Sequence, residues 1–132
     1  LDKLIIILKE NMIKSIKLPV SAPFHCSLMS KATKIMSKEL NELNFTQSEN
    51  KLISNVTAKE ILSTGELKDL LIKQIENRVR WRESVINMIN NDVNHFIEIG
   101  PGKVLSGLVK RINKEVKIST INNQGDIEGL EI

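Results

Sequence analysis

Apolar residues recur along the chain at the two spacings that distinguish helices from strands. Helical spacing, in which an apolar side chain returns every three or four residues, is found at 1–13, 28–43, 66–80, 82–91 and 103–113. Short apolar runs typical of strands occupy 13–20, 51–56, 96–99 and 116–121, and residues 126–132 are compatible with a short terminal helix. Because strands alternate with helices, we predict an α/β fold with a largely parallel sheet.

Local signals indicate where some of these elements begin and which of their faces are buried. Pro19 and Pro23 bracket and stiffen a turn after the first strand. Ser27 is the predicted N-cap of the helix over 28–43. The side chains predicted to face inward from the helices over 66–80 and 82–91 are Leu67, Leu70, Leu71, Ile75, Val85, Met88 and Ile89.

Composition and charge narrow the class of protein. The chain has 132 residues, enough for one compact domain, with three Phe, one Trp and no Tyr, so its core must be built mainly from Ile, Leu and Val. The formal net charge is +3 with scattered basic residues. A nucleic-acid interface would need clustered basic residues, and so we predict none. The longest apolar run covers residues 4–8, far short of the ~20 residues that cross a bilayer, so no membrane segment is predicted.

The cysteine and the histidine beside it are the first candidates for chemistry. His25 follows a predicted strand, where ligands bind in α/β sheets, and a neutral imidazole there could accept a proton. The alternative is a surface or helix-capping histidine. Neighbouring side chains in an extended segment point to opposite faces, which argues against a catalytic dyad of His25 and Cys26. We interpret Cys26 as a small, buried hydrophobic residue. A single cysteine excludes an internal disulfide, which fits a reducing cytoplasm.

Two further segments could contribute to a site. Gln74 borders the apolar stripe of its helix, where an amide near a core would need partners; a boundary amide pointing to solvent is the alternative. Residues 98–103, Glu-Ile-Gly-Pro-Gly-Lys, join a strand to a helix. A glycine turn before a helix N-terminus can hold an anion. However, neither G-x-x-x-x-G-K-[ST] nor G-x-G-x-x-G is present, and a tight turn without a ligand is the simpler interpretation.

The remaining candidates favour structural roles. Trp81, between Arg80 and Arg82, is predicted to pack at the helix bend and not to stack on an arginine. His95 opens a strand without a visible partner, so we interpret it as structural. No pair of His, Cys or carboxylate residues has metal-ligand spacing. The G-x-S-x-G of a serine nucleophile elbow occurs nowhere in the sequence.

Two motifs taken together resemble a known family. Residues 18–29, Leu-Pro-Val-Ser-Ala-Pro-Phe-His-Cys-Ser-Leu-Met, resemble the segment around the catalytic histidine of malonyl-CoA:acyl-carrier-protein transacylases. The family's strand running into Glu-x-Gly-Pro-Gly-Lys-Val-Leu-x-Gly-Leu is matched by residues 98–108. Between them lie the family's long helix, its Asn-Val step at residues 55–56 and a helix ending in Trp81. The resemblance covers roughly residues 13–123.

The resemblance implies an activity and two site residues. Family members transfer malonyl from coenzyme A to the phosphopantetheine thiol of acyl carrier protein through a malonyl-serine ester. His25 matches the histidine that takes the serine proton and returns it to the departing thiol. Gln74 matches the position whose main-chain carbonyl orients that imidazole. No cofactor or metal is implied beyond the substrate malonyl-CoA and the phosphopantetheine carried by the acyl carrier protein.

The resemblance also implies a fold and a domain organisation. Family members have an α/β-hydrolase-like acyltransferase body with a small ferredoxin-like subdomain inserted in it. Residues 1–17 match the end of that insertion, and residues 18–132 match the C-terminal part of the body.

Three features of the family find no match in the sequence. The nucleophile elbow, the glutamine-rich turn of the oxyanion hole and the arginine that pairs with the malonyl carboxylate all lie upstream of the matched segment. We therefore expect the isolated chain to be inactive and poorly stable, with half of the sheet absent, an exposed edge and an uncovered core face. The chain could be a split-gene product, a truncated gene product or a fragment of a full enzyme, and the sequence does not choose among these origins. A split-gene product would have a separate N-terminal half as its partner.

Other functions also stay open at this point. The chain could be an inactive relic, or it could bind acidic acyl carrier proteins without catalysis, using Lys103, Lys110 and Arg111 near the glycine turn. It could also be a piece of a polyketide synthase acyltransferase domain. Charge reversal of the three basic residues would test carrier-protein binding. Flanking domains in the parent reading frame would test the polyketide synthase alternative.

Overall fold

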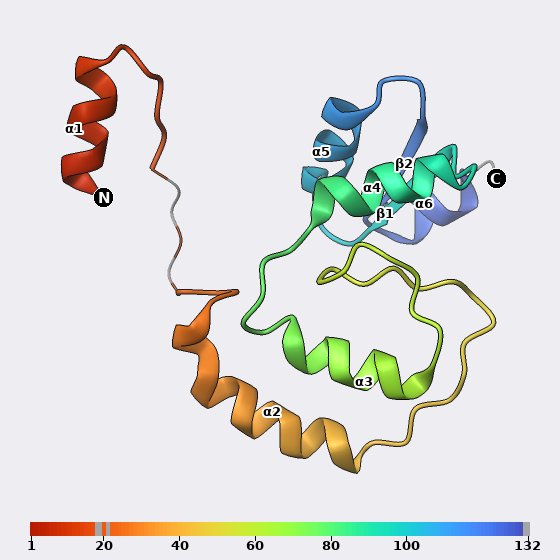
Figure 1. The fold of residues 1–132 in the computed structure, drawn as a ribbon. Coiled ribbons are helices and arrows are strands. Elements are labelled where there is room, and N and C mark those ends of the chain that lie inside the picture. Colours follow the sequence, from red (N-terminus) through yellow and green to blue (C-terminus); the bar gives the residue numbers. More distant parts are fainter. Residues whose placement is uncertain (18–19, 21, 131–132) are drawn as a thin grey trace.

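The computed structural model of the protein describes residues 1–17, 20 and 22–130. In chain order its elements are α1 (Asp2–Glu10), η1 (Ser27–Met29), α2 (Ser30–Glu42), α3 (Thr64–Lys73), α4 (Trp81–Asn90), β1 (His95–Ile99), α5 (Val104–Ile112), β2 (Lys117–Ile121) and α6 (Gln124–Glu128). Figure 1 shows α1 at one end, α2 beside α3, and the later elements gathered around the two strands.

The sheet consists of β1 and β2, which pair in parallel with His95 opposite Lys117 and Ile99 opposite Ile121. Isoleucine is frequent in both strands, as expected for short apolar runs. Parallel strands need a crossover connection, and α5 provides it while packing against both strands. The predicted parallel sheet is therefore confirmed, in a two-stranded form among the described residues.

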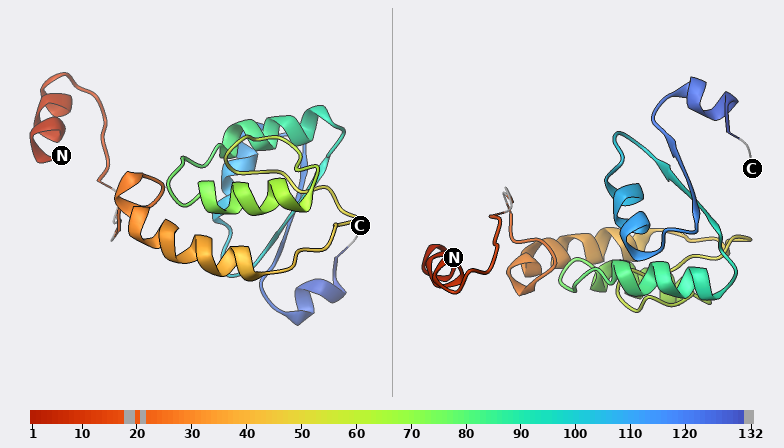
Figure 2. Two further views of the ribbon diagram at one scale, coloured as in Figure 1. Left: turned by 60° about the horizontal axis from the view of Figure 1, so that its bottom comes forward. Right: turned by 90° about the horizontal axis from the view of Figure 1, so that it is seen from above.

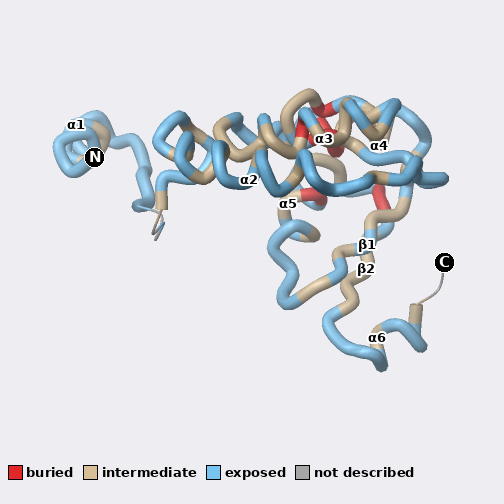
Figure 3. Tube along the Cα trace, turned by 90° about the horizontal axis from the view of Figure 1, so that it is seen from below, coloured by how far each residue is buried: buried red, intermediate tan, exposed pale blue. Residues whose placement is uncertain are grey.

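One small core lies between α4, α5 and the sheet. Its centre is formed by Val85, Val109 and Val116, which are exposed by 0%, 3% and 6%. The side chains packed around this centre are Trp81, Met88, Ile89, Phe96, Ile112 and Ile118. Figure 3 shows buried segments around α3, α4 and α5 and none on α1 or α2. The inward positions predicted for α4 are confirmed, as is the packing role of Trp81, which begins the helix.

Helix α3 begins at a reciprocal cap and ends earlier than predicted. Ser63 Oγ accepts the amide of Glu66 at 3.1 Å, and Glu66 Oε2 accepts the amide of Leu62 at 2.8 Å. The helix ends at Lys73 and not at residue 80. Asn77 Nδ2 donates to Lys73 O at 2.7 Å, and such a side chain competes with the backbone for the last carbonyls.

Two predicted local features at the beginning of the chain are wrong. Residues 13–17 and 20 of the expected strand over 13–20 form no strand, because no neighbouring strand of the described residues pairs with them. Residues 18 and 19, which include Pro19, lie outside the described residues. Ser27 does not cap α2: it begins the 3₁₀ turn η1, and the residue before α2 is Met29, which makes no side-chain cap.

Two further predictions need correction in their details. The strand expected over 51–56 is a single antiparallel bridge between Ile53 and Glu60, because the chain doubles back within a few residues and pairs with itself. The terminal helix begins at Gln124 and not at residue 126. Asn123 and Asp126 form a capping box there, which starts the helix earlier.

Large apolar side chains remain exposed on several elements. Leu28 is 74% exposed, Ile99 79% and Val104 72%. Helix α1 packs against none of the other described helices and strands, and both views in Figure 2 show it standing apart. None of the described helices is long and apolar enough to cross a membrane.

Candidate functional site

The structure brings His25 and Gln74 together from positions 49 residues apart. His25 Nδ1 lies 2.8 Å from the main-chain oxygen of Gln74. A carbonyl oxygen only accepts hydrogen bonds, so Nδ1 must be the donor. In a neutral imidazole this leaves Nε2 with the lone pair. The contact therefore selects a tautomer and orients the ring with Nε2 as its basic nitrogen.

The backbone at His25 has an uncommon conformation. Its φ is +59°, in the left-handed region that few non-glycine residues adopt and in which histidine is enriched. Residues held in this region often lie at functional sites, where the surrounding structure imposes the conformation. The turn leads directly into η1 and α2, and α2 packs against α3. This packing places residue 25 beside the end of α3.

Gln74 offers its carbonyl because it is the C-cap of α3. The last carbonyls of a helix lack partners within the helix. They also form the negative end of its dipole, which favours a nearby cation. A histidine that gains a proton during a reaction would be stabilised by this position.

The side chain of Gln74 has a different environment from its carbonyl. It is half-buried, and its Oε1 lies 3.5 Å from Nδ2 of Asn55, at the outer limit of a hydrogen bond. Both amides border a cavity of about 220 Å³ whose walls include Leu67 and Leu70. The side chain therefore lies at the edge of an apolar cavity, in contact with a second amide.

Asn55 is a residue whose place in the site the sequence reasoning missed. Its main-chain oxygen accepts the amide of Arg80 at 2.8 Å, and its side chain meets Gln74. Asn55 thus connects its turn to Gln74 at the end of α3 and to Arg80 just before α4. The available signal was weak: an asparagine that ends a short apolar run.

Cys26 does not join His25. Its Sγ donates to Pro23 O at 3.2 Å, and the residue is half-buried. His25 itself is exposed, as is Phe24, by 59%. The predicted absence of a Cys–His dyad agrees with these contacts, and the predicted burial of the cysteine is only partly met.

The glycine turn after β1 is organised around Glu98. Its Oε1 accepts the amide of Leu105 at 3.0 Å, and its Oε2 accepts the amide of Ser106 at 2.7 Å. The nearby Ser106 side chain, and hydrogen bonds from the backbone amides of Ser106 and Leu105, hold the pKa of Glu98 below its ordinary value. The carboxylate thus occupies the N-terminus of α5, which favours the interpretation of a turn without a ligand.

Glycine is required at two positions of this turn. Gly100 has a φ of +133° and Gly102 a φ of +98°, which side chains rarely allow. The amide of Gly102 donates to Asn122 Oδ1 at 2.6 Å. The turn is therefore tied to the residue that follows β2.

His95 and Lys110 both have structural partners. His95 Nε2 lies 2.8 Å from Ser119 Oγ across the strand pair, a partner that the sequence did not reveal. Lys110 Nζ donates to the carbonyl of Lys114 at 2.7 Å. Lys103, Lys110 and Arg111 are the basic rim proposed above for carrier binding. Of these, Lys110 already holds the loop before β2.

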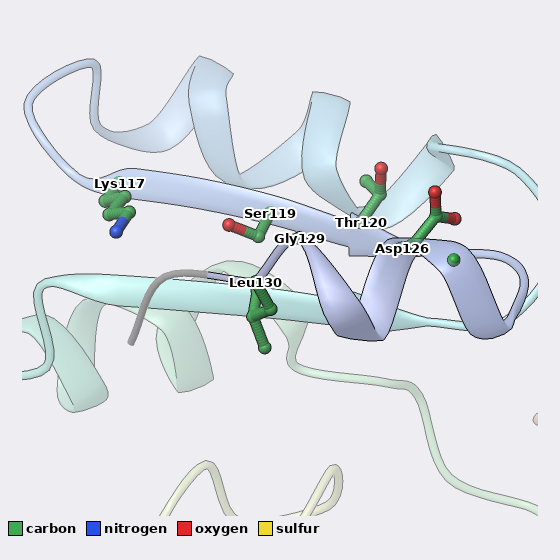
Figure 4. A pocket seen from close by; sticks show the side chains of 7 residues that line it. Lys117, Ser119, Thr120, Asp126, Gly129 and Leu130 are labelled. Carbon is green, nitrogen blue, oxygen red and sulfur yellow. The ribbon is translucent and has the colours of Figure 1, made fainter.

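A cavity of about 420 Å³ lies between β2 and α6, and Figure 4 shows the side chains that line it. Its lining residues are Lys117, Ser119, Thr120, Gly125, Asp126, Gly129 and Leu130. Asp126 Oδ2 accepts the amide of Asn122 at 2.8 Å, so this carboxylate serves as a cap. The cavity contains neither His25 nor Gln74. Within the described residues no group of three or more His, Cys, Asp or Glu side chains could hold a metal ion.

The chain is similar along most of its length to malonyl CoA-acyl carrier protein transacylases. It is 40% identical over 121 residues to the one from Bacillus subtilis (strain 168), a match that covers 91% of the chain and 38% of that protein. The crystal structure of the transacylase from Clostridium perfringens ATCC 13124 superposes with a TM-score of 0.86 and 38% identity, over 97% of this chain and 40% of that one. The chain therefore spans about two fifths of these relatives.

A second similar structure contains a carrier protein. It is described as a type II polyketide acyl-carrier protein in complex with its malonyl-transacylase. It superposes with a TM-score of 0.78 and 33% identity, over 84% of this chain and 36% of that one. No family model matches the chain.

Proposed function

We propose that this chain, which is homologous to the C-terminal part of malonyl CoA-acyl carrier protein transacylases, supplies the histidine base for malonyl transfer from malonyl-CoA to acyl carrier protein. The observation that carries the proposal is the 2.8 Å contact between His25 Nδ1 and Gln74 O. His25 is the catalytic residue in this proposal. Gln74 is a positioning residue that acts through its main chain.

The first half of the reaction uses Nε2 of His25 as a general base. It takes the proton of a serine hydroxyl while the serine oxygen attacks the thioester carbonyl of malonyl-CoA. The carbon–sulfur bond breaks, and the proton passes from Nε2 to the departing coenzyme A thiolate. The products are free coenzyme A and a malonyl-serine ester. The Gln74 carbonyl stabilises the transient imidazolium by accepting from Nδ1.

The second half runs the same proton transfer in the opposite direction. Nε2 takes the proton of the phosphopantetheine thiol, and the sulfur attacks the carbonyl carbon of the malonyl-serine ester. The carbon–oxygen bond breaks, and the serine oxygen regains the proton from Nε2. The malonyl group leaves on the carrier protein, and no cofactor or metal is needed for any step.

The nucleophilic serine comes from outside this chain in our proposal. No G-x-S-x-G segment occurs in the 132 residues, and that segment provides the strained turn which exposes a nucleophile. The chain alone is then inactive. Residues 18–132 belong to the C-terminal part of an α/β-hydrolase-like acyltransferase body, residues 1–17 end a ferredoxin-like insertion, and the reaction takes place in the cytoplasm.

The proposal is tested by intact mass and by transfer. The purified chain is incubated with malonyl-CoA, alone and with the part of the Bacillus subtilis transacylase that this chain does not span. We expect no malonyl adduct on the chain alone. We expect transfer to acyl carrier protein in the mixture, and its loss with His25→Ala. A malonyl adduct on the isolated chain, for example on Cys26, would contradict the proposed serine.

Carrier binding without catalysis is the second candidate, and it is favoured by the similar structure solved with an acyl carrier protein. Acyl carrier proteins are acidic, so a basic rim would attract them. Lys110 already donates to a loop carbonyl, so the test uses charge-reversal substitutions of Lys103 and Arg111 and measures carrier binding. A polyketide carrier protein and a fatty-acid carrier protein should be compared, since the relative's partner belongs to the first class. Carrier binding that survives both reversals would contradict this function.

A further inference from the structure

A cavity between α4 and the chain segment over residues 51–62 takes no part in the proposed reaction. Its volume is about 630 Å³, and small-molecule sites typically enclose about 300–1,000 Å³. Figure 1 shows this segment, in yellow to yellow-green, running beside α4. Neither His25 nor Gln74 lines the cavity, so it lies outside the candidate site described above.

Hydrogen bonds within the chain hold the walls of this cavity in place. Ile53 and Glu60 form an antiparallel bridge in one wall. Asn87 Nδ2, on α4, donates to Ala58 O at 2.9 Å and thereby connects the two walls. Asn91 Nδ2 donates to Asn87 Oδ1 at 3.1 Å. The walls are therefore formed before any ligand arrives, which lowers the entropic cost of binding.

Part of the lining is apolar and exposed. The apolar residues that line the cavity are Ile53, Leu62, Met88 and Val93, and Leu62 is 74% exposed. A hydrocarbon chain that covered this surface would gain about fourfold in affinity for each methylene that it buried. The lining thus favours a ligand with an aliphatic body.

The charged residues at the cavity carry one positive charge in excess. Lys51, Lys59 and Glu60 line it. Lys51 Nζ lies 3.3 Å from Glu60 Oε2, so this lysine offsets the carboxylate. Lys59 forms no ion pair within the described part of the chain. Its amine can therefore pair with one negative group of a ligand.

We propose that this cavity binds an aliphatic monocarboxylate, with its carboxylate at Lys59 and its hydrocarbon chain against Ile53, Leu62 and Met88. The two halves of such a molecule match the two kinds of lining. An aliphatic amine would place a second positive charge beside Lys59. A short carboxylate such as acetate would leave the apolar surface uncovered, and so both should bind more weakly.

Titration of the full chain followed by NMR tests the site directly, with octanoate as the probe. We expect shifts at the amides of Ile53, Leu62 and Met88 with a Kd of about 0.1–1 mM, which a ligand of this size allows. Decanoate should bind about tenfold more tightly, because it buries two more methylenes. Acetate and octylamine should leave these amides unchanged at the same concentrations. Equal shifts with octylamine, or shifts at other exposed apolar residues only, would overturn the proposal.

Two pairs of substitutions separate the charged contact from the apolar one. Lys59→Glu should weaken octanoate binding about three- to tenfold, whereas Lys38→Glu, on the exposed surface of α2, should leave it unchanged. Leu62→Ser should weaken it by a similar factor, and Ile35→Ser is its control, at a position of α2 that is 63% exposed. Equal effects within either pair would overturn the proposal.

The binding measurements are independent of malonyl transfer. His25→Ala should bind octanoate as tightly as the unmodified chain does, because His25 does not line the cavity. Loss of octanoate binding in this variant would place the carboxylate at the candidate site and overturn the proposal. Octanoate binding by a chain that supports no malonyl transfer would contradict the proposed function alone.

Discussion

His25 Nδ1 lies 2.8 Å from Gln74 O, so a side chain at the entrance to α2 is held by the main chain at the end of α3. Because the acceptor belongs to the backbone, its position depends on where α3 ends and little on which side chain residue 74 carries. The imidazole itself has no such substitute. The two residues should therefore respond very differently to mutation.

Replacement of the imidazole should abolish its role as a base. In the mixture with the complementary transacylase part, we expect His25→Ala to lower the rate of malonyl transfer by about 10²–10⁴-fold, the usual contribution of a general base. The rate is measured with radiolabelled malonyl-CoA and acyl carrier protein. His95→Ala is the matched control, because His95 contacts Ser119 in the sheet. Equal losses for the two variants would contradict the assignment.

Replacement of the Gln74 side chain should have a small effect. Gln74→Ala keeps the main-chain carbonyl and removes only the amide that contacts Asn55 at 3.5 Å. We expect transfer to change by less than about tenfold, much less than for His25→Ala, because no more than one weak hydrogen bond is lost. Asn55→Ala is the companion variant and should behave alike. A loss from Gln74→Ala as large as that from His25→Ala would show that the side chain takes part.

The contrast between β1 and residues 13–20 shows which part of the fold could be predicted. Both segments are short apolar runs. Strand β1 finds a parallel neighbour, β2, through a helix that follows immediately in the sequence, whereas the described residues 13–17 and 20 form no strand. Hydrophobic periodicity shows which residues tend to be buried. Whether a segment becomes a strand also depends on whether a neighbouring strand is available to pair with it. The strands that pair with a neighbour close in the sequence were therefore predictable, whereas the conformation of residues 13–17 was not.

The candidate site shows the same division. His25 stood out by residue type and by motif, and the contact with Gln74 followed only from the resemblance. The left-handed backbone at His25 and the capping role of Glu98 could not be read from spacing, because both arise from tertiary arrangement. The partner of His95 was missed for the same reason, since Ser119 lies on the other strand.

The core should be sensitive to the loss of two methyl groups at its centre. Val85 is 0% exposed and contributes the centre of the cluster between α4, α5 and the sheet. Val85→Ala should lower the free energy of unfolding by roughly 1–3 kcal/mol through lost burial and a small cavity. Urea unfolding followed by circular dichroism measures this. Val79→Ala, at a position that is 39% exposed, should cost less, and an equal loss would contradict the assigned core.

The cap at α5 should make the stability of the chain depend on acid pH. Hydrogen bonds from Ser106 and neighbouring amides lower the pKa of Glu98 from 4.5 in the folded state, so the unfolded chain binds the proton more readily. The stabilisation is therefore fully present above about pH 4.5 and is lost as the pH falls through the lower folded pKa. Glu98→Gln should destabilise the chain near pH 7, and its difference from the unmodified chain in urea unfolding should shrink below pH 4.5. A difference for Glu98→Gln that stays constant with pH would contradict the cap.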